Sequence, residues 1–120
     1  MIDEIKNAII ESAEISNDEH GCLSAWLHLD YGGSGQGFGG YVLYLPDSFT
    51  HSEAQGPAAG HFIFRCLEVA GVGKWSQLKG MTIRAKTEGR GFGGVITAIG
   101  HIVNDDWFDP KADFKRMRDQ

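Results

Sequence analysis

Six of the nine residues from Gly32 to Gly40 are glycine, in the run Gly-Gly-Ser-Gly-Gln-Gly-Phe-Gly-Gly. Glycine weakens the interior of helices and strands because it loses more conformational freedom on folding than any other residue. The run therefore predicts a long loop. Apolar and polar residues alternate from Leu23 to Tyr31, and a second apolar segment covers Tyr41 to Leu45. We expect two strands joined by the glycine run as a hairpin.

Three other segments have the features of helices. Apolar residues recur at steps of three and four over residues 2–15, which predicts an N-terminal amphipathic helix. Residues 57–70 begin with a proline and are followed by a glycine, which are usual start and end signals of a helix. A short helical turn is expected near Trp75. Asp109 and Pro110 suit the N-cap and first turn of a C-terminal helix.

Two more strands are expected in the second half of the chain, at Met81–Glu88 and Val95–Val103. The predicted order is α-ββ-α-ββ-α, which is a four-stranded antiparallel sheet of two hairpins with N-terminal, central and C-terminal helices. A chain of 120 residues has the length of one ordinary domain. We therefore predict a single α+β domain that covers residues 1–120.

The charge of the chain disfavours some classes of binding partner. The formal net charge is −5, which disfavours nucleic acid and anionic membranes as the main partner. The charge is uneven, because residues 1–19 carry six acidic side chains against one lysine, and residues 74–90 carry five basic ones against one glutamate. No signal peptide and no long apolar run are evident, so a cytoplasmic protein with reduced cysteines is predicted.

The glycine run contains Gly35-x-Gly37-x-x-Gly40, which formally fits a dinucleotide-binding fingerprint. That fingerprint requires a helix after the glycines, and here a predicted strand follows, so nucleotide binding of this type is rejected. A protein-kinase glycine loop is rejected because the chain has no catalytic loop. Two roles of the glycine run remain possible: its backbone amides form an anion-binding nest, or its glycines only allow the hairpin loop to turn. The recurrence of Gln36–Gly40 as Arg90–Gly94 fits either a duplication or a coincidence.

A weak metal-site hypothesis rests on His28 and Asp30, which point to the same side of a predicted strand, with His101 added from another strand. The alternative is a polar face in water, partly covered by Trp26. The spacing lacks the close pairs of ligands that mark metal sites, so no metal and no cofactor is predicted.

Five segments call for comparison with known sequences: Gly35–Tyr44 (GQGFGGYVLY), Gly60–Phe62 (GHF), Gly71–Gly80 (GVGKWSQLKG), Ala98–Ile102 (AIGHI) and Trp107–Pro110 (WFDP). Together they resemble a small family of bacteriophage and prophage accessory proteins, and the resemblance covers nearly the whole chain after residue 23. It implies a phage or prophage origin and action in the bacterial host cytoplasm. It brings no catalytic residues with it.

We therefore predict a non-enzymatic phage accessory protein that binds a host protein or sequesters a small anionic ligand, as in host takeover or anti-CRISPR-like counter-defence. No catalytic residue is assigned. The residues expected to contact the ligand or partner come from the glycine run, its flanks and a basic strand: Tyr31, Ser34, Gln36, Phe38, Tyr41, Arg84 and Lys86. Two alternatives stay open. One is a small nucleotide-handling or metal-dependent enzyme, and the other is a nucleic-acid-handling protein. The site of the enzyme would use His28, Asp30 and His101 together with the basic strand residues Arg84 and Lys86.

Self-association is the last expectation. The predicted strand Val95–Val103 is apolar on both faces, so it must be central or covered. A symmetric dimer covers such a strand, and the acidic N-terminal helix can complement the basic residues 74–90 across the contact. The alternative is a monomer in which the C-terminal helix covers the second face.

Overall fold

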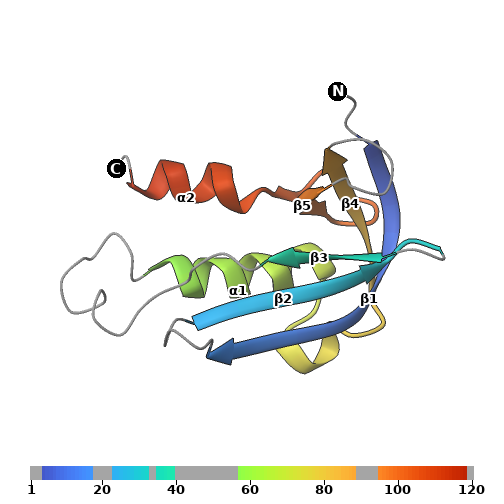
Figure 1. Ribbon diagram of the computed structural model, residues 1–120, viewed down its shortest axis with the longest axis horizontal. Helices are drawn as coiled ribbons and strands as arrows, with labels where there is room; N and C mark the ends of the chain where they lie inside the picture. The colour runs from blue at the N-terminus through green and yellow to red at the C-terminus, as the bar shows by residue number, and fades with distance from the viewer. Residues whose placement is uncertain (1–3, 18–22, 33–34, 40–56, 89–94, 119–120) are drawn as a thin grey trace.

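The computed structural model describes residues 4–17, 23–32, 35–39, 57–88 and 95–118. Its strands are β1 (Glu4–Asn17), β2 (Leu23–Asp30), β3 (Gly35–Gly39), β4 (Thr82–Glu88), β5 (Val95–Gly100) and β6 (Trp107–Phe108). Its helices are α1 (Pro57–Ala70) and α2 (Pro110–Arg118), with a 3-10 turn, η2 (Trp75–Gln77). The strands form one six-stranded antiparallel sheet in the order β3-β2-β1-β4-β5-β6 (Figure 1).

The prediction of a four-stranded sheet with three helices is therefore wrong, and the main error lies at the N-terminus. Residues that were expected to form a helix form β1, a strand of 14 residues. Ala8 and Ile10 point into the core, and the register then shifts between Ile10 and Ser12, so that Ala13 is the next residue to face inward. The apolar residues that imitate a helix lie on both sides of β1, because Ile5 and Ile9 are exposed on one side while Ala8 and Ala13 face the core on the other. The two-residue period of the strand is therefore hidden.

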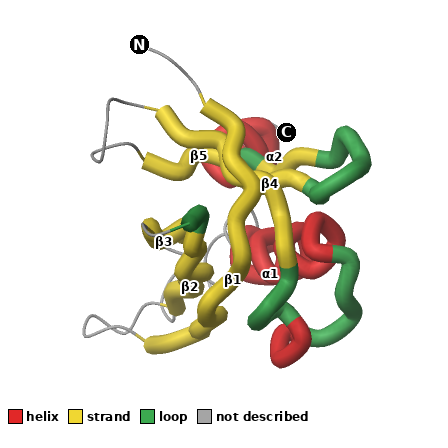
Figure 2. The backbone as a smooth tube through the Cα atoms, turned by 90° about the vertical axis from the view of Figure 1, so that its right-hand side faces the viewer, coloured by secondary structure: helices red, strands yellow, loops and turns green. Residues whose placement is uncertain are grey.

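β1 joins the two parts of the sheet. Its N-terminal half pairs with β4 over Glu4–Ile9, and its C-terminal half pairs with β2 over Ile9–Asn17. The sheet bends strongly along this strand, as Figure 2 shows, and the bend brings β3 close to β5. At the bend, the Ile10 amide donates to the Met81 carbonyl at 2.9 Å, and the Gly80 amide donates to the Ile10 carbonyl at 2.7 Å.

Two further parts of the predicted sheet differ. The glycine run was expected to be a loop, but residues 35–39 form β3 and pair with β2, while the expected strand at residues 41–45 lies outside the described residues. The expected strand at residues 95–103 ends at Gly100, because the chain turns there. The amides of Val103 and Asn104 donate to His101 Nδ1 at 3.0 and 2.9 Å, and this local turn leads into β6.

The predictions for the rest of the chain are confirmed: α1, η2, β4 and α2 lie at the expected positions. α2 has the expected cap, because the Ala112 amide donates to Asp109 Oδ1 at 3.1 Å. The apolar stripe of α1 and the capping residue of α2 made the helices readable from sequence, and two-residue alternation did the same for β4.

The core lies between the concave side of the bent sheet and α1. Three phenylalanines meet at its centre, and Phe38, Phe62 and Phe108 are each fully buried, with ring centroids 5.5–6.1 Å apart. Both helices lie on this inner side of the sheet (Figures 1 and 2). The opposite side, which we call the outer face, has none of the described helices over it.

Candidate functional site

The outer face carries several large apolar side chains that water contacts. Strand register places Ile5 and Ile9 of β1, Trp26 of β2 and Val95 of β5 on this side. Their exposed fractions are 58%, 48%, 38% and 60% respectively. Scattered exposed apolar residues are ordinary, but several on one uncovered sheet face mark a surface suited to association.

Trp26 lies against a strand that has no side chains on its outer side. β3 presents Gly35, Gly37 and Gly39 outward, since Gln36 and Phe38 point the other way. A Cβ on Gly37 would lie only 2.8 Å from two atoms of the Trp26 ring, so glycine is required for the indole to rest there. The ring covers a strand that glycine would otherwise weaken, and β3 in turn fixes the direction of the ring.

The surroundings of Trp26 are acidic. Glu14 of β1 lies opposite Trp26 in the strand register, and His28 lies beside it with its ring centroid 6.3 Å from that of Trp26 and an angle of 18° between the planes. Glu14 Oε2 lies 3.5 Å from His28 Nε2, and the Glu14 side chain is 65% exposed. We call Glu14, Trp26, His28 and Gly37 the aromatic patch.

A second tryptophan is held in a similar way at the other end of the outer face. Trp107 of β6 lies against Gly100 of β5, where an added Cβ would lie 2.7 Å from the indole. The Arg84 guanidinium lies 4.8 Å from the Trp107 ring centroid. Arg84 also donates to the carbonyl oxygens of His101 and Asn104 at 2.7 Å each. This arginine therefore closes the turn between β5 and β6.

The residues predicted to contact a partner are not gathered in one place. Phe38 is fully buried in the core, and Gln36 points to the same inner side. Tyr31 packs against the core with the Lys6 ammonium 5.2 Å from its ring centroid, and partial burial raises the pKa of its hydroxyl. Ser34 and Tyr41 lie outside the described residues. Of the two basic candidates, Arg84 stacks on Trp107 and donates to the His101 carbonyl, and Lys86 is half-buried on β4.

The candidate metal ligands also occupy separate places. His28 and Asp30 share the outer side of β2, as expected, whereas His101 follows β5 and accepts two backbone hydrogen bonds. Within residues 4–17, 23–32, 35–39, 57–88 and 95–118, no three side chains of His, Cys, Asp or Glu are grouped closely enough to hold a metal ion.

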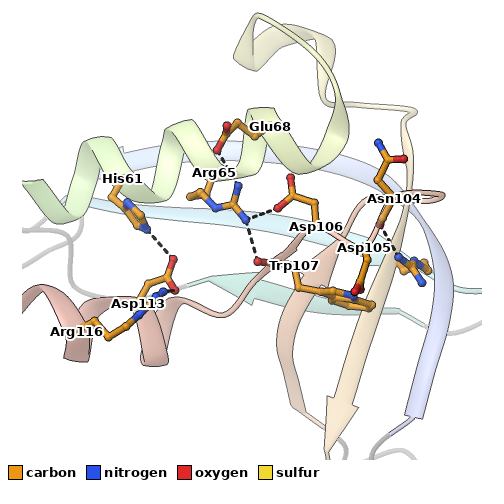
Figure 3. Close-up of polar contacts among 10 residues, drawn as sticks. His61, Arg65, Glu68, Asn104, Asp105, Asp106, Trp107, Asp113 and Arg116 are labelled. Atoms are coloured by element: carbon orange, nitrogen blue, oxygen red, sulfur yellow. Dashed lines mark hydrogen bonds and ion pairs between the residues drawn. The ribbon is translucent and has the colours of Figure 1, made fainter.

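A polar network joins the two helices on the inner side of the sheet (Figure 3). His61 Nε2 of α1 lies 2.7 Å from Asp113 Oδ2 of α2, and Figure 3 shows the two side chains pointing toward each other. Arg65 donates to Asp106 Oδ1 at 2.7 Å, to Glu68 Oε1 at 2.7 Å and to the Trp107 carbonyl at 2.8 Å. The hydrogen bond with Asp106 is the largest cause of the raised pKa of Arg65. These contacts fasten α1 to α2 and to β6.

A histidine–carboxylate pair can serve as a general base when a nucleophile lies within its reach. The ring of His61 instead contacts Phe108 and Phe114 edge-on, at 5.7 and 6.3 Å between centroids. Cys66 is fully buried, and burial raises the pKa of its thiol to about 12, so it stays protonated at neutral pH. Both residues serve the packing of α1.

A shallow depression of about 280 Å³ lies between the end of β4, β5 and the start of α2. Two acidic and two basic side chains line it together with a threonine and an alanine: Glu88, Asp109, Lys111, Lys115, Thr97 and Ala112. Sites for small organic ligands are usually larger and mostly apolar. The depression therefore does not resemble such a site.

No protein-family model, curated protein or solved structure matches this chain. In the part of the chain that the structure describes, neither helix has the length and apolar character needed to cross a bilayer. The aromatic patch and the neighbouring isoleucines of β1 are thus the best candidate site. Sequence reasoning placed Trp26 on the polar side of its strand but missed Glu14, because residues 2–15 were expected to form a helix.

Proposed function

We propose that this chain is a non-enzymatic binding protein of phage or prophage origin that acts in the bacterial cytoplasm by occupying a host protein. The observation that carries the proposal is the uncovered outer face, on which Ile5, Ile9 and Trp26 are each more than a third exposed. The resemblance to phage accessory proteins supports the origin and the compartment.

The outer face has the composition of a protein-binding surface. Complete burial of an isoleucine stabilises a complex by about 1.5–3 kcal/mol, and tryptophan is among the residues that contribute most to interfaces. Trp26 loses little freedom on binding, because Gly37 already fixes the position of its ring. An open, convex sheet surface with a held aromatic ring suits a protein partner better than a small molecule.

The test is affinity capture from bacterial lysate with the tagged chain, followed by identification of the captured protein and a binding titration with that protein in purified form. Ile9→Glu places a charge at the centre of the outer face and should weaken binding at least about tenfold. Phe64→Glu is the matched control, since Phe64 is 59% exposed on α1, away from the outer face. Equal binding by Ile9→Glu and the unaltered chain, or failure to capture any protein, contradicts the proposal.

A further inference from the structure

The two tryptophans of the outer face are both positioned by glycines, but at different parts of their rings. Each indole lies against a glycine of the neighbouring strand, Trp26 against Gly37 and Trp107 against Gly100, with a would-be Cβ at 2.8 and 2.7 Å from the ring. Gly100 lies against the face of the six-membered ring of Trp107, where an added Cβ would be 2.7–2.8 Å from three ring atoms, whereas Gly37 lies against the Cε3–Cζ3 edge of the Trp26 ring. An aromatic ring face carries a negative quadrupole and attracts cations.

The pairs differ in what accompanies the ring. Trp107 has the Arg84 guanidinium 4.8 Å from its ring centroid. Trp26 has no such cation nearby on its own part of the sheet, because the described segments 9–17, 23–32 and 35–39 contain no lysine or arginine. Those segments contain three carboxylates, Glu11, Glu14 and Asp30. Trp26 therefore has an exposed indole with carboxylates in the surrounding described segments and no arginine or lysine among them.

The acidic neighbours favour a cation from another molecule. Glu14 pairs with Trp26 in the strand register, and its side chain is 65% exposed. A guanidinium stacked on the indole can donate to this carboxylate at the same time, since it is planar and has donors along its edge. The His28 ring is nearly parallel to the indole, with 18° between the planes, and extends the aromatic surface.

We propose that the aromatic patch receives an arginine side chain of the partner protein, stacked on Trp26 and paired with Glu14. This inference rests on the proposed function, and it states the chemistry that the partner must present. An arginine is preferred to a lysine because a guanidinium stacks on a ring and an ammonium does not.

The first experiment needs no identified partner. The purified chain is titrated with the capped tripeptide Gly-Arg-Gly while amide and indole NMR signals are recorded. The Trp26 indole and Gly37 signals should shift, with a weaker response to Gly-Lys-Gly and none to the uncharged citrulline peptide. Glu14→Gln should weaken the arginine response roughly two- to fivefold, as for an exposed ion pair. Trp26→Phe keeps an aromatic ring and should weaken it further, and Phe64→Ala should leave it unchanged.

Equal responses to the arginine and citrulline peptides overturn the inference, as does an arginine response that Glu14→Gln and Trp26→Phe both leave intact. Shifts of Trp26 that grow with protein concentration alone also overturn it, because they show that a second copy occupies the patch. The captured host protein separates the two proposals. If Ile9→Glu abolishes its binding while Glu14→Gln and Trp26→Phe do not, the proposed function stands and the arginine contact is wrong. If no host protein is captured, the peptide titration still decides the arginine contact.

Discussion

The guanidinium of Arg84 lies on the indole of Trp107, 4.8 Å from the ring centroid, and holds that ring against Gly100. The arginine comes from β4 and the tryptophan from β6, so the contact crosses β5. Two hydrogen bonds to the carbonyls of His101 and Asn104 fix the arginine in this position. The short strand β6 thus remains attached although it contains only two residues.

Replacement of Arg84 should therefore loosen the end of the sheet. Arg84→Met removes both hydrogen bonds and the stacked cation, and we expect the free energy of unfolding to fall by about 1–3 kcal/mol. Arg84→Lys should recover little of this, because one ammonium cannot reproduce the planar set of donors. Urea unfolding measures the change. Full recovery in Arg84→Lys contradicts the described role.

A methyl group at Gly100 should have a similar effect for a steric reason. Its Cβ would lie 2.7 Å from the Trp107 ring, so the ring has to move. We expect Gly100→Ala to lower the free energy of unfolding by about 1–3 kcal/mol. Gly73→Ala is the control, because nothing lies within 4 Å of its Cβ position. Thermal unfolding of both variants tests the prediction, and equal melting temperatures refute it.

Replacement of Gly60 by alanine should raise the stability instead of lowering it. Gly60 is an exposed residue in the first half of α1, and nothing lies within 4 Å of an added Cβ. Alanine is a better helix former than glycine by about 0.8–1 kcal/mol, so Gly60→Ala should raise the free energy of unfolding by up to about this amount. A loss of stability in chemical denaturation would show that α1 is not a regular helix at this position.

The His61–Asp113 contact can be tested by a double-mutant cycle. The two side chains lie 2.7 Å apart, and the Asp113 side chain is only 13% exposed. We expect a coupling free energy of about 0.5–3 kcal/mol between His61→Ala and Asp113→Ala. Lys111→Ala, an exposed change on the same helix, provides the control pair with His61→Ala. Additive effects of the His61 and Asp113 changes would show that the contact does not fasten α1 to α2.

The buried thiol of Cys66 predicts a specific loss of stability in alkali. Burial raises its pKa from 9.0 to about 12, so the unfolded chain releases this proton first as the pH rises. Stability should therefore fall between pH 9 and about 12, with a contribution from this one group of up to about 1.4 kcal/mol per pH unit. Cys66→Ala should unfold with a shallower pH dependence over that range. Parallel curves for both proteins contradict the prediction.

The sequence predicted the helices better than the sheet. The apolar stripe and terminal glycine of α1, and the Asp109 cap of α2, are local signals, so they can be recognised without the rest of the fold. β1 was predicted as a helix because its apolar residues lie on both sides of the strand, Ile5 and Ile9 on one side and Ala8 and Ala13 on the other. The register shift between Ile10 and Ser12 lies where β1 passes from pairing with β4 to pairing with β2, and no local pattern reveals this change of partner.

The candidate site depends on contacts between strands. Alternation correctly predicted that Trp26, His28 and Asp30 share one side of β2. β3 was not expected, since glycine disfavours strands, and it persists because the Trp26 ring covers Gly37. Phe38 was assigned to an exposed loop for the same reason. Once residues 35–39 are a strand, its side chain must face the core.

The division of β1 between two partners also determines how the chain folds during its synthesis. The C-terminal half of β1 meets β2 as soon as residue 30 has left the ribosome, but Glu4 pairs with Thr87, which lies 83 residues later. Until then the first half of β1 has no neighbour in the sheet, and Ile5 lies on a bare strand edge. The nascent chain thus has an unpaired strand edge until residue 87 has emerged, and we expect chaperones or misassembly to act first at this edge.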